Sequence, residues 1–345
     1  MAAPTIPNGK DHFNTILYTG TGAEHAVTGV GFAPDKVVIK RRDTTSDWGA
    51  FDTSRGVTKN LKWNKTDGES TEVQSLKTFG TDGFTLGTGG DFNGSGGTFV
   101  AYNWLANGGT TTSNTDGSVT STVQANTTAG FSIVRWTGGG SAATVGHGLS
   151  QAPEWIFYKR TSASGDGWIT YHTGQNTSPA NGSMQLQSSG GFNTDSTLWN
   201  NTAPTSSVIS IGSYGMGSSE ERTAWVWHSV EGYSKFGKYV GNGNTDGTFV
   251  YTGFRPAFVL MKRANSTGNW YLKDTTRDTF NRCEKTLMPN LSNAEAAQTY
   301  IDILSNGFKQ RIGNDASNLS GSTYIYIAFA EHPFVGDGTN PVTAR

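Results

Sequence analysis

The sequence predicts an all-β protein made of three tandem, diverged β-sandwich domains of the jelly-roll or concanavalin-like type. Composition is the first observation, because the 345 residues include 46 glycines and only 15% are charged, well under the roughly 25% of an ordinary soluble domain. The second is a series of short apolar or alternating runs bounded by Gly, Asn and Asp, which are typical of strands. The third is an internal repeat that occurs three times.

The clearest part of the repeat is a block in which a proline precedes a Lys-Arg pair by a constant spacing. The block reads GFAPDKVVIKR at residues 31–41, APEWIFYKR at 152–160 and GFRPAFVLMKR at 253–263. Proline fixes φ at the end of a loop, and the continuous apolar run after it is typical of a strand buried on both faces. We therefore expect Pro34, Pro153 and Pro256 each to introduce an equivalent buried strand, after which the Lys-Arg pair leads the chain out to water.

Further segments recur around this block in a constant order. Each repeat opens with an aromatic strand, and a tryptophan with a polar residue four positions later follows the Lys-Arg pair. Each repeat closes with a second aromatic strand. The openers are 12–20, 130–138 and 232–241, the Trp pairs are Trp48 with Asp52, Trp168 with His172 and Trp270 with Asp274, and the closers are 98–104, 224–228 and 323–329.

The repeats are long enough to be whole domains. The equivalent residues Phe13, Phe131 and Tyr233 lie much farther apart than the roughly 20–50 residues of a solenoid repeat. We place the domains at residues 1–109, 110–231 and 232–345. Each is expected to pack two sheets around its own aromatic rings.

Two segments depart from this strand pattern. Residues 292–301 combine an Asn or Ser cap with an Ala-rich run, which predicts one or two helical turns. Residues 110–129, between the first and second repeats, start with a Gly-, Thr- and Ser-rich stretch that suits a flexible tether. Because residues 118–125 alternate between polar and apolar types, we favour an ordered strand at a sheet edge.

Charge and cysteine content exclude several classes of protein. The formal net charge of −1 provides no field to attract nucleic acid or an anionic membrane, and no stretch approaches the roughly 18 apolar residues of a membrane span. Residues 1–10 lack the basic and apolar regions of a secretory signal, which predicts synthesis in a cytoplasm. The single cysteine, Cys283, excludes an intrachain disulfide and is expected to be a small buried side chain.

No catalytic, cofactor or metal centre is predicted. The six histidines show no metal-ligand spacing, and there is no G-x-S-x-G elbow. Residues 242–247 resemble the start of a calcium loop, but Gly253 occupies the position of the bidentate glutamate. The polar residue after the tryptophan is Asp52, His172 or Asp274, and a catalytic acid would not be expected to vary in this way.

Three aromatic residues outside the shared segments are candidates for carbohydrate binding. Trp63, Trp199 and Tyr214 stand among polar residues. Sugars bind to such rings through their C–H faces and to neighbouring Asn, Asp and Gln side chains. The alternative, which we favour for each residue taken singly, is that the ring fills the core of its own repeat.

The chain also resembles a known family. The Pro to Lys-Arg block, the Trp-x-x-x-Asp pairing, residues 305–309 and the C-terminal segments 328–334 and 340–345 look like those of virion proteins of tailed bacteriophages, common in phages of cyanobacteria and other marine bacteria. The resemblance covers essentially the whole chain. It implies concanavalin-like β-sandwich domains of the kind found in tail fibres and other surface appendages, and it implies no catalytic or binding residues.

We therefore expect a non-enzymatic structural protein of the virion surface, made in the host cytoplasm. Its expected role is that of a tail-fibre or appendage subunit that contacts other virion proteins, forms a homo-oligomer, with a trimer favoured, and adheres to host-surface carbohydrate. A capsid decoration protein is the first alternative. A polysaccharide depolymerase is the second, since two catalytic carboxylates can lie far apart in a chain.

Overall fold

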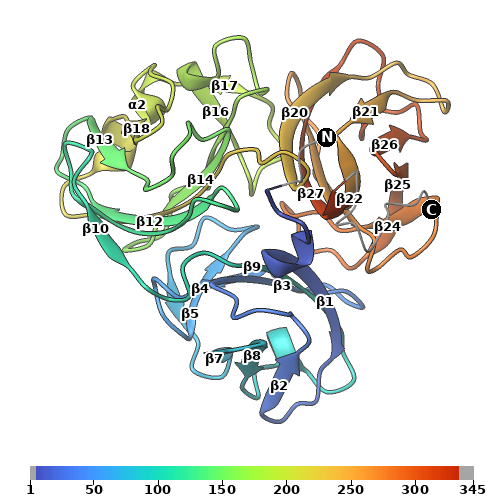
Figure 1. The fold of residues 1–345 in the computed structure, drawn as a ribbon, viewed down its shortest axis with the longest axis horizontal. Coiled ribbons are helices and arrows are strands. Elements are labelled where there is room, and N and C mark those ends of the chain that lie inside the picture. Colours follow the sequence, from blue (N-terminus) through green and yellow to red (C-terminus); the bar gives the residue numbers. More distant parts are fainter. Residues whose placement is uncertain (1–4, 334–345) are drawn as a thin grey trace.

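The computed structural model describes residues 5–333, which form three lobes around a common centre (Figure 1). Lobe 1 runs from the 3-10 helix η1 to β9, lobe 2 from β10 to β19 and lobe 3 from β20 to β27. The predicted all-β sandwich fold is confirmed, while the domain boundaries near residues 109 and 231 remain a prediction. The C-terminal segment 340–345 that contributes to the family resemblance lies outside the described residues, as does residue 334.

Lobe 1 consists of a six-stranded antiparallel sheet, in the order β1-β9-β3-β4-β5-β6, and a three-stranded sheet, in the order β2-β8-β7. One helical turn, α1, lies between β8 and β9. The bounds are η1 Gly9–Asp11, β1 Phe13–Thr19, β2 His25–Thr28, β3 Lys36–Arg41, β4 Gly49–Asp52, β5 Lys59–Lys62, β6 Ser70–Thr71, β7 Leu76–Gly80, β8 Gly83–Leu86, α1 Gly90–Asn93 and β9 Thr98–Trp104.

Lobe 2 consists of an eight-stranded sheet, in the order β10-β11-β12-β19-β14-β15-β16-β17, and a two-stranded sheet formed by β13 and β18. Three short helical turns connect these strands. The bounds are β10 Thr112–Asn114, β11 Ser121–Asn126, β12 Phe131–Thr137, β13 Ala143–Gly146, β14 Trp155–Arg160, β15 Ile169–His172, η2 Pro179–Asn181, β16 Gly182–Gln185, β17 Asn193–Thr194, α2 Ser196–Trp199, β18 Val208–Ile211, η3 Ser213–Met216 and β19 Glu221–Trp227.

Lobe 3 consists of two four-stranded sheets, in the orders β20-β27-β22-β23 and β21-β26-β25-β24. Its second sheet has more strands than the three-stranded sheet of lobe 1 or the two-stranded sheet of lobe 2. The bounds are β20 Ser234–Val240, β21 Phe249–Tyr251, β22 Phe254–Arg263, β23 Trp270–Asp274, β24 Cys283–Thr286, β25 Ala296–Leu304, β26 Gly307–Gln310 and β27 Thr323–Pro333.

One sheet of each lobe contains the same four kinds of strand in the same order, and we call these three sheets the inner sheets. In each lobe the opening strand pairs with the closing strand, which pairs with the strand after the signature proline, which pairs with the Trp strand. These sets are β1-β9-β3-β4, β12-β19-β14-β15 and β20-β27-β22-β23. The third strand of each set, which we call the signature strand, therefore has equivalent neighbours three times, although in lobe 3 it begins before the proline, at Phe254. The other sheet of each lobe is called the outer sheet. The outer sheets are β2-β8-β7, β13-β18 and β21-β26-β25-β24, and they differ in strand number.

Each inner sheet is covered on both faces. In lobe 1, Val37 and Ile39 of β3 face the outer sheet and pack in a cluster that belongs to that lobe alone, while Val38 faces the centre of the molecule. All three side chains are fully buried, which confirms the prediction of a strand buried on both faces. Because successive side chains of a strand point to opposite faces, one strand serves two cores.

The centre of the molecule is a single apolar cluster shared by the three lobes, and it changes the expectation that each repeat has only its own core. This central cluster contains every tryptophan except Trp136 and Trp199. Rings from different lobes touch there: Phe13 of lobe 1 stacks on Phe329 of lobe 3 at 4.9 Å. The aromatic residues thus join the lobes as well as filling each one.

The predicted helix at residues 292–301 is wrong, because much of this segment forms strand β25 (Ala296–Leu304). Its burial alternates toward the C-terminal end, with Thr299, Ile301 and Ile303 buried. The strand pairs with β24 on one side and β26 on the other. Tertiary pairing therefore overrides the local helix preference of an Ala-rich run.

Residues 110–129 are ordered, as favoured from the sequence, but β11 does not lie at the sheet edge. The short strand β10 pairs on its outer side, and the buried Gln124 of β11 donates hydrogen bonds to Thr53 and Ser54 of lobe 1. The approach to this segment is fixed by Asp35, whose carboxylate accepts backbone N–H groups from Ala106 and two following glycines. Residues 110–129 therefore form an ordered, hydrogen-bonded contact between lobes 1 and 2.

Candidate functional site

The tryptophan of each repeat joins its lobe to the next in a cyclic pattern. The indole Nε1 of Trp48 in lobe 1 donates to the Leu291 carbonyl of lobe 3 at 3.0 Å. Trp270 of lobe 3 donates to Gln185 of lobe 2 at 3.1 Å, and Trp168 of lobe 2 donates to Lys62 of lobe 1 at 2.9 Å. The recurrence of this residue is therefore explained by contacts between lobes.

The polar residue four positions later also contacts a neighbouring lobe, and we call each such contact between two lobes a junction. Which residue occupies the position depends on the hydrogen-bond donor that the neighbouring lobe presents. Asp52 accepts the Nε1–H of Trp225 at 3.2 Å, and Asp274 accepts the hydroxyl of Tyr102 at 2.8 Å. The register of the inner sheets places Ile327 at the position of these two donors. Since Ile327 has no donor, a carboxylate there would be unpaired, and lobe 2 carries His172 instead.

His172 is a neutral replacement for the aspartates. Its Nε2 lies 3.1 Å from the Tyr326 carbonyl, and its Nδ1 accepts the N–H of Gly174 at 2.9 Å, so the network assigns the proton to Nε2. Burial lowers the pKa of His172 to about 4. The arrangement therefore requires an uncharged imidazole.

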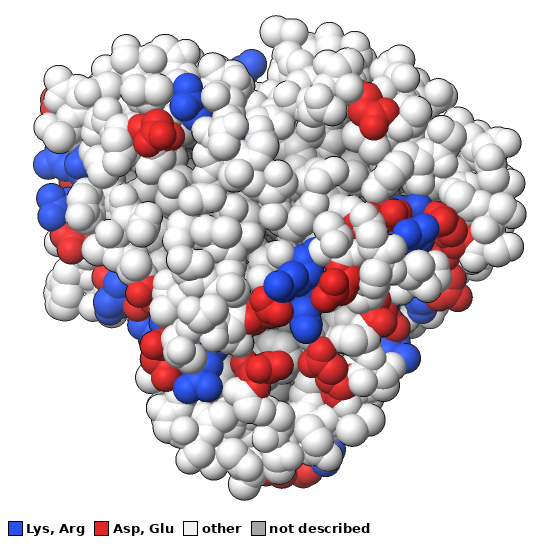
Figure 2. Space-filling view, turned by 180° about the vertical axis from the view of Figure 1, so that it is seen from behind, with Lys and Arg blue, Asp and Glu red and all other residues white. Residues whose placement is uncertain are grey.

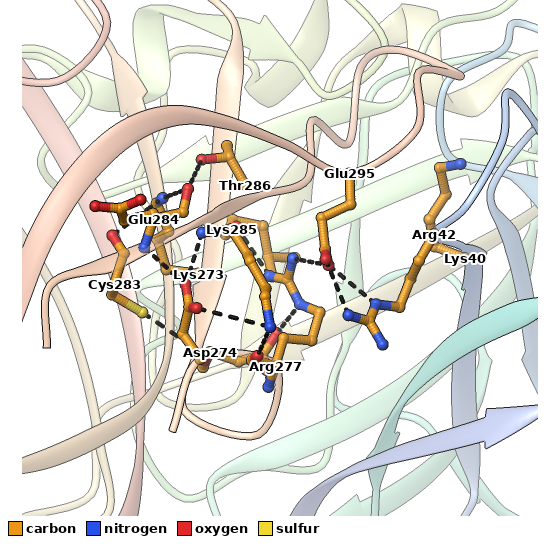
Figure 3. A network of polar contacts seen from close by, with 12 residues as sticks. Lys40, Arg42, Lys273, Asp274, Arg277, Cys283, Glu284, Lys285, Thr286 and Glu295 are labelled. Carbon is orange, nitrogen blue, oxygen red and sulfur yellow. Dashed lines mark hydrogen bonds and ion pairs between the residues drawn. The ribbon is translucent and has the colours of Figure 1, made fainter. Parts of the chain in front are cut away.

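Each aspartate is held by an arginine three residues later, and Figure 3 shows the network in lobe 3. Arg277 binds Asp274 through Nε and binds Glu295 through a terminal nitrogen at 3.0 Å. Glu295 also forms a bidentate pair with Arg42 of lobe 1, at 2.9 and 3.0 Å. Lobe 1 repeats the pattern with Asp52 and its own arginine. Through Glu295 this network joins lobe 3 to lobe 1.

The lysine of the Lys-Arg block does not lead the chain out to water, which corrects the prediction. Lys40, Lys159 and Lys262 are fully buried. The ammonium of Lys40 donates to the Ser292 carbonyl of lobe 3, and that of Lys262 donates to the Ser189 carbonyl of lobe 2. Burial lowers the pKa values of these lysines to about 8, 8 and 7, in that order.

One further lysine, Lys36, lies in the central cluster. Its Nζ is 3.7 Å from the ring centroid of Trp104 and 4.5 Å from that of Trp225. Within the described residues this Nζ has no hydrogen-bond partner. Burial lowers its pKa well below 10.5, against the opposing charge of Asp52. Trp155 and Phe258 occupy the equivalent positions in the other lobes.

The structure separates the three predicted carbohydrate contacts. Trp63 lies in the central cluster and Trp199 in the core of lobe 2, both with no exposed surface. Neither ring can stack on a sugar. Trp199 fills the core of its own repeat, as the alternative expected, whereas Trp63 fills the centre that the three lobes share. Their polar sequence neighbours gave no sign of this, because the atoms that cover Trp63 come from other lobes, such as Phe157 at 6.1 Å.

Tyr214 is the remaining candidate, and it lines a cavity of about 270 Å³ in lobe 2. Gln185, Ser188, Asn193 and Asp195 contribute polar groups to the same cavity. The Asp195 carboxylate is oriented by the N–H and hydroxyl of Thr197 at the start of α2. An aromatic ring beside amide, hydroxyl and carboxylate groups matches the chemistry of a sugar site.

Exposed aromatic rings were not found from the sequence, and those among the described residues lie in lobe 3. The strongly exposed ones are Phe249, Tyr251 and Phe280, whose exposed fractions are 45%, 61% and 80%. Phe249 and Tyr251 alternate with the buried Val250 in β21. That alternation was a signal available in the sequence, since it is typical of a strand with one face in water.

Residues 8–333 match the domain of unknown function DUF7483. The chain belongs to this family. The match covers all three lobes in one continuous stretch, in keeping with the shared central cluster. No curated protein and no solved structure matches the chain.

The charged side chains on the face drawn in Figure 2 form no large area of a single sign. Seen from behind, basic and acidic side chains lie beside one another and leave large uncharged areas between them (Figure 2). Residues 5–333 contain no group of three or more His, Cys, Asp or Glu that could hold a metal ion. In the segment 242–247, Asn242 and Asn244 accept backbone N–H groups of their own loop. None of the described helices is long and apolar enough to cross a bilayer.

Proposed function

We propose that this chain is a non-enzymatic protein of a virion surface, a tail-fibre or appendage subunit that binds host-surface carbohydrate through the lobe 2 cavity around Tyr214. The resemblance of the repeat blocks to phage virion proteins supports the virion setting. The balanced net charge supports a ligand that is neither nucleic acid nor an anionic membrane. Other virion proteins and further copies of this chain are its proposed partners.

The observation that carries the carbohydrate assignment is the composition of the cavity. Tyr214 offers a ring for the C–H face of a sugar, and Gln185, Asn193 and Asp195 offer planar polar groups for its hydroxyls. The size of about 270 Å³ suits one terminal sugar rather than a long chain. The Arg222 guanidinium lies 5.5 Å from the centroid of the Tyr214 ring and helps to hold the ring in place.

Binding of single sugars to the full chain tests this proposal. We expect millimolar titration with glucose, galactose, mannose and their N-acetyl forms to produce binding of at least one sugar, and Tyr214→Ala to weaken it about fivefold to tenfold. Val73→Ala, a truncation at an exposed position of lobe 1, is the matched control. Absence of binding, or equal affinity of the wild type and Tyr214→Ala, would overturn the assignment.

The virion setting has its own test, because carbohydrate binding alone does not locate the protein. Gold-labelled antibody against the chain is expected to decorate tails or appendages of intact particles. Decoration of capsomers instead would favour a capsid decoration protein. Sedimentation of the purified chain would show whether three copies of it form the expected trimer.

A further inference from the structure

A second cavity lies on lobe 3, and no part of the function proposed above uses it. It has a volume of about 780 Å³ and is lined by Asp246, Arg282, Glu284, Asp302 and Arg311, together with Thr245 and Asn281. Most of these residues come from the outer sheet β21-β26-β25-β24 or from the segments that flank it, which lies at the right of Figure 1. The cavity is thus a groove on an outer sheet.

Strand register explains why these side chains share one face. The inward residues of the sheet, such as Val250, Ile301 and Phe308, pack in the core of lobe 3. Phe249 is the register partner of Lys309, and Lys309 is the register partner of Asp302. These side chains alternate with the inward ones and therefore point to solvent in one row across neighbouring strands.

Three exposed aromatic residues lie in or next to the strands of the same outer sheet, although none of them lines the groove itself. The Phe249 ring lies over Gly307, because a Cβ at that glycine would be 3.1 Å from the ring. Tyr251 follows two residues later on the same side of β21. Phe280 precedes Asn281, whose side chain is fixed by two hydrogen bonds to the backbone of Ile303. Exposed rings on the face of a sheet are suited to stacking on the C–H faces of sugars.

The charges in the groove are matched in pairs. Arg311 lies 3.0 Å from Asp302, and Arg282 lies 2.6 Å from Glu284. The Lys309 ammonium binds Asp246 at 2.6 Å and holds the pKa of this carboxyl below its usual range. Since each cation already has a carboxylate partner, the groove offers no excess positive charge for an anionic ligand.

Paired charges still provide oriented hydrogen-bond groups. A guanidinium donates several N–H groups in a fixed plane, and a carboxylate accepts at both oxygens. The Arg282 guanidinium is also held over the Tyr300 ring at 4.2 Å from its centroid. Neutral hydroxyl groups, which both donate and accept, match such a surface better than a ligand of either charge.

This outer sheet has more strands than its counterparts in the other lobes. The outer sheet of lobe 1 has three strands and that of lobe 2 has two. Across the four strands of lobe 3 the face spans about 14 Å, since neighbouring strands lie about 4.8 Å apart. That span fits a short stretch of polysaccharide rather than a single sugar.

We propose that the outer sheet of lobe 3 binds a neutral polysaccharide chain across its strands, with Phe249 and Tyr251 stacking on sugar rings and Arg282, Asp302 and Arg311 binding hydroxyls. This extends the proposed carbohydrate adhesion to a second site and is independent of the Tyr214 cavity. Two sites on one chain raise the avidity for a polymer that reaches both.

Calorimetric titration of the full chain with neutral hexasaccharides of glucose, galactose and mannose, and with a sulfated galactan fragment, tests the proposal. We expect at least one neutral hexasaccharide to bind more tightly than its monosaccharide and more tightly than the sulfated fragment. Phe249→Ala and Tyr251→Ala should each weaken that binding about fivefold. Arg282→Gln should weaken it as well, because a single amide with two N–H donors replaces the guanidinium with its five.

The matched variants separate this site from the lobe 2 cavity. Tyr214→Ala should weaken monosaccharide binding and leave the affinity for the hexasaccharide unchanged, while Tyr251→Ala should weaken hexasaccharide binding and leave monosaccharide binding unchanged. If Tyr214→Ala alone alters binding of both ligands, or if no hexasaccharide binds, the lobe 3 site is wrong. Preference for the sulfated fragment would also overturn it. If only the lobe 3 variants lose binding, the lobe 2 assignment fails and this one stands.

Discussion

The inner and outer sheets of this protein have diverged in opposite ways. The inner sheets keep the same strand order, a buried lysine after the signature strand and a tryptophan that donates to the next lobe. The outer sheets have three, two and four strands, and the strongly exposed aromatic residues of the described chain are confined to lobe 3. Residues that recur hold the lobes together, so ligand binding is expected where the lobes differ.

The junctions between the lobes also differ from one another in whether their buried polar residues are charged. Lobes 1 and 3 use a buried Asp-Arg pair, while lobe 2 uses His172 with Gln175, both uncharged. The exchange follows from Ile327, which replaces the donors Tyr102 and Trp225. A junction can therefore be charged or neutral, provided that the polar residue, the residue three positions later and the facing residue of the neighbouring lobe all change together.

The largest expected effect comes from breaking one charged junction. Asp274→Ala leaves Arg277 buried beside a single remaining carboxylate and leaves the Tyr102 hydroxyl without its acceptor. We expect the free energy of unfolding to fall by about 3–5 kcal/mol, measured by urea denaturation. If that variant does not fold, Asp274→Asn provides the measurement, with a smaller loss.

The control for this variant is an aspartate that is paired but exposed. Asp246→Ala removes the partner of Lys309 on the surface of lobe 3. The free energy of unfolding should change by less than about 0.5 kcal/mol. Equal losses in Asp246→Ala and Asp274→Ala would contradict the role of the junction.

Removing the buried charge of Lys36 should stabilise the protein. Trp155 and Phe258 show that the equivalent positions are apolar, and methionine has nearly the shape of lysine without its charge. We expect Lys36→Met to raise the free energy of unfolding by about 1–4 kcal/mol at neutral pH. A loss of stability would mean that the cation–π contacts with the tryptophans outweigh the desolvation of the ammonium.

The same residue gives a pH dependence of known sign. Burial lowers the pKa of Lys36 below the 10.5 of the unfolded chain, so the unfolded state binds more protons between the two values. Stability then rises with pH through this window, and Lys262 and Lys273, with pKa values of about 7, act in the same direction. Melting temperatures should rise from about pH 7 to 9, and less steeply in Lys36→Met. Parallel curves would contradict this.

A smaller difference should separate two buried tryptophans. Trp168 and Trp199 are both fully buried, but Nε1 of Trp168 donates to Lys62 across a junction, while that of Trp199 has no partner within the described residues. Trp168→Phe should therefore cost about 1 kcal/mol more than Trp199→Phe. Thermal melts of both variants measure the difference, and equal costs would remove the contribution of the junction hydrogen bond.

The smallest effect on stability is expected on the outer sheet of lobe 3. Tyr251→Ala truncates an exposed ring whose neighbours in β21 carry the packing. Its free energy of unfolding should stay within about 0.5 kcal/mol of the wild type, although we expect it to lose hexasaccharide affinity. A large loss of stability would show that Tyr251 has a structural role.

The sequence predicted the parts of the fold that are encoded locally. The signature strands and their burial on both faces follow from short apolar runs and from their repetition, and both are confirmed. The burial of Cys283, expected because it is the single cysteine, is confirmed as well. The strand β11 was signalled by alternation. These features depend on neighbours within the same few residues.

The errors share a cause, which is that the deciding contacts come from other lobes or distant strands. Lys40 lies near the end of β3 and was expected in water, yet its ammonium donates to a carbonyl of lobe 3. Trp63 has polar neighbours in sequence and aromatic neighbours in space. The groove residues Glu284, Asp302 and Arg311 come together only through strand pairing.

Native-state hydrogen exchange tests most directly whether the three lobes share one core. The amides of β9, β19 and β27, the closing strands of the three inner sheets, report on the three lobes separately. The shared central cluster predicts one exchange free energy for all three, equal to the global free energy of unfolding from urea denaturation. Three different values, with one lobe opening while the others stay protected, would contradict it.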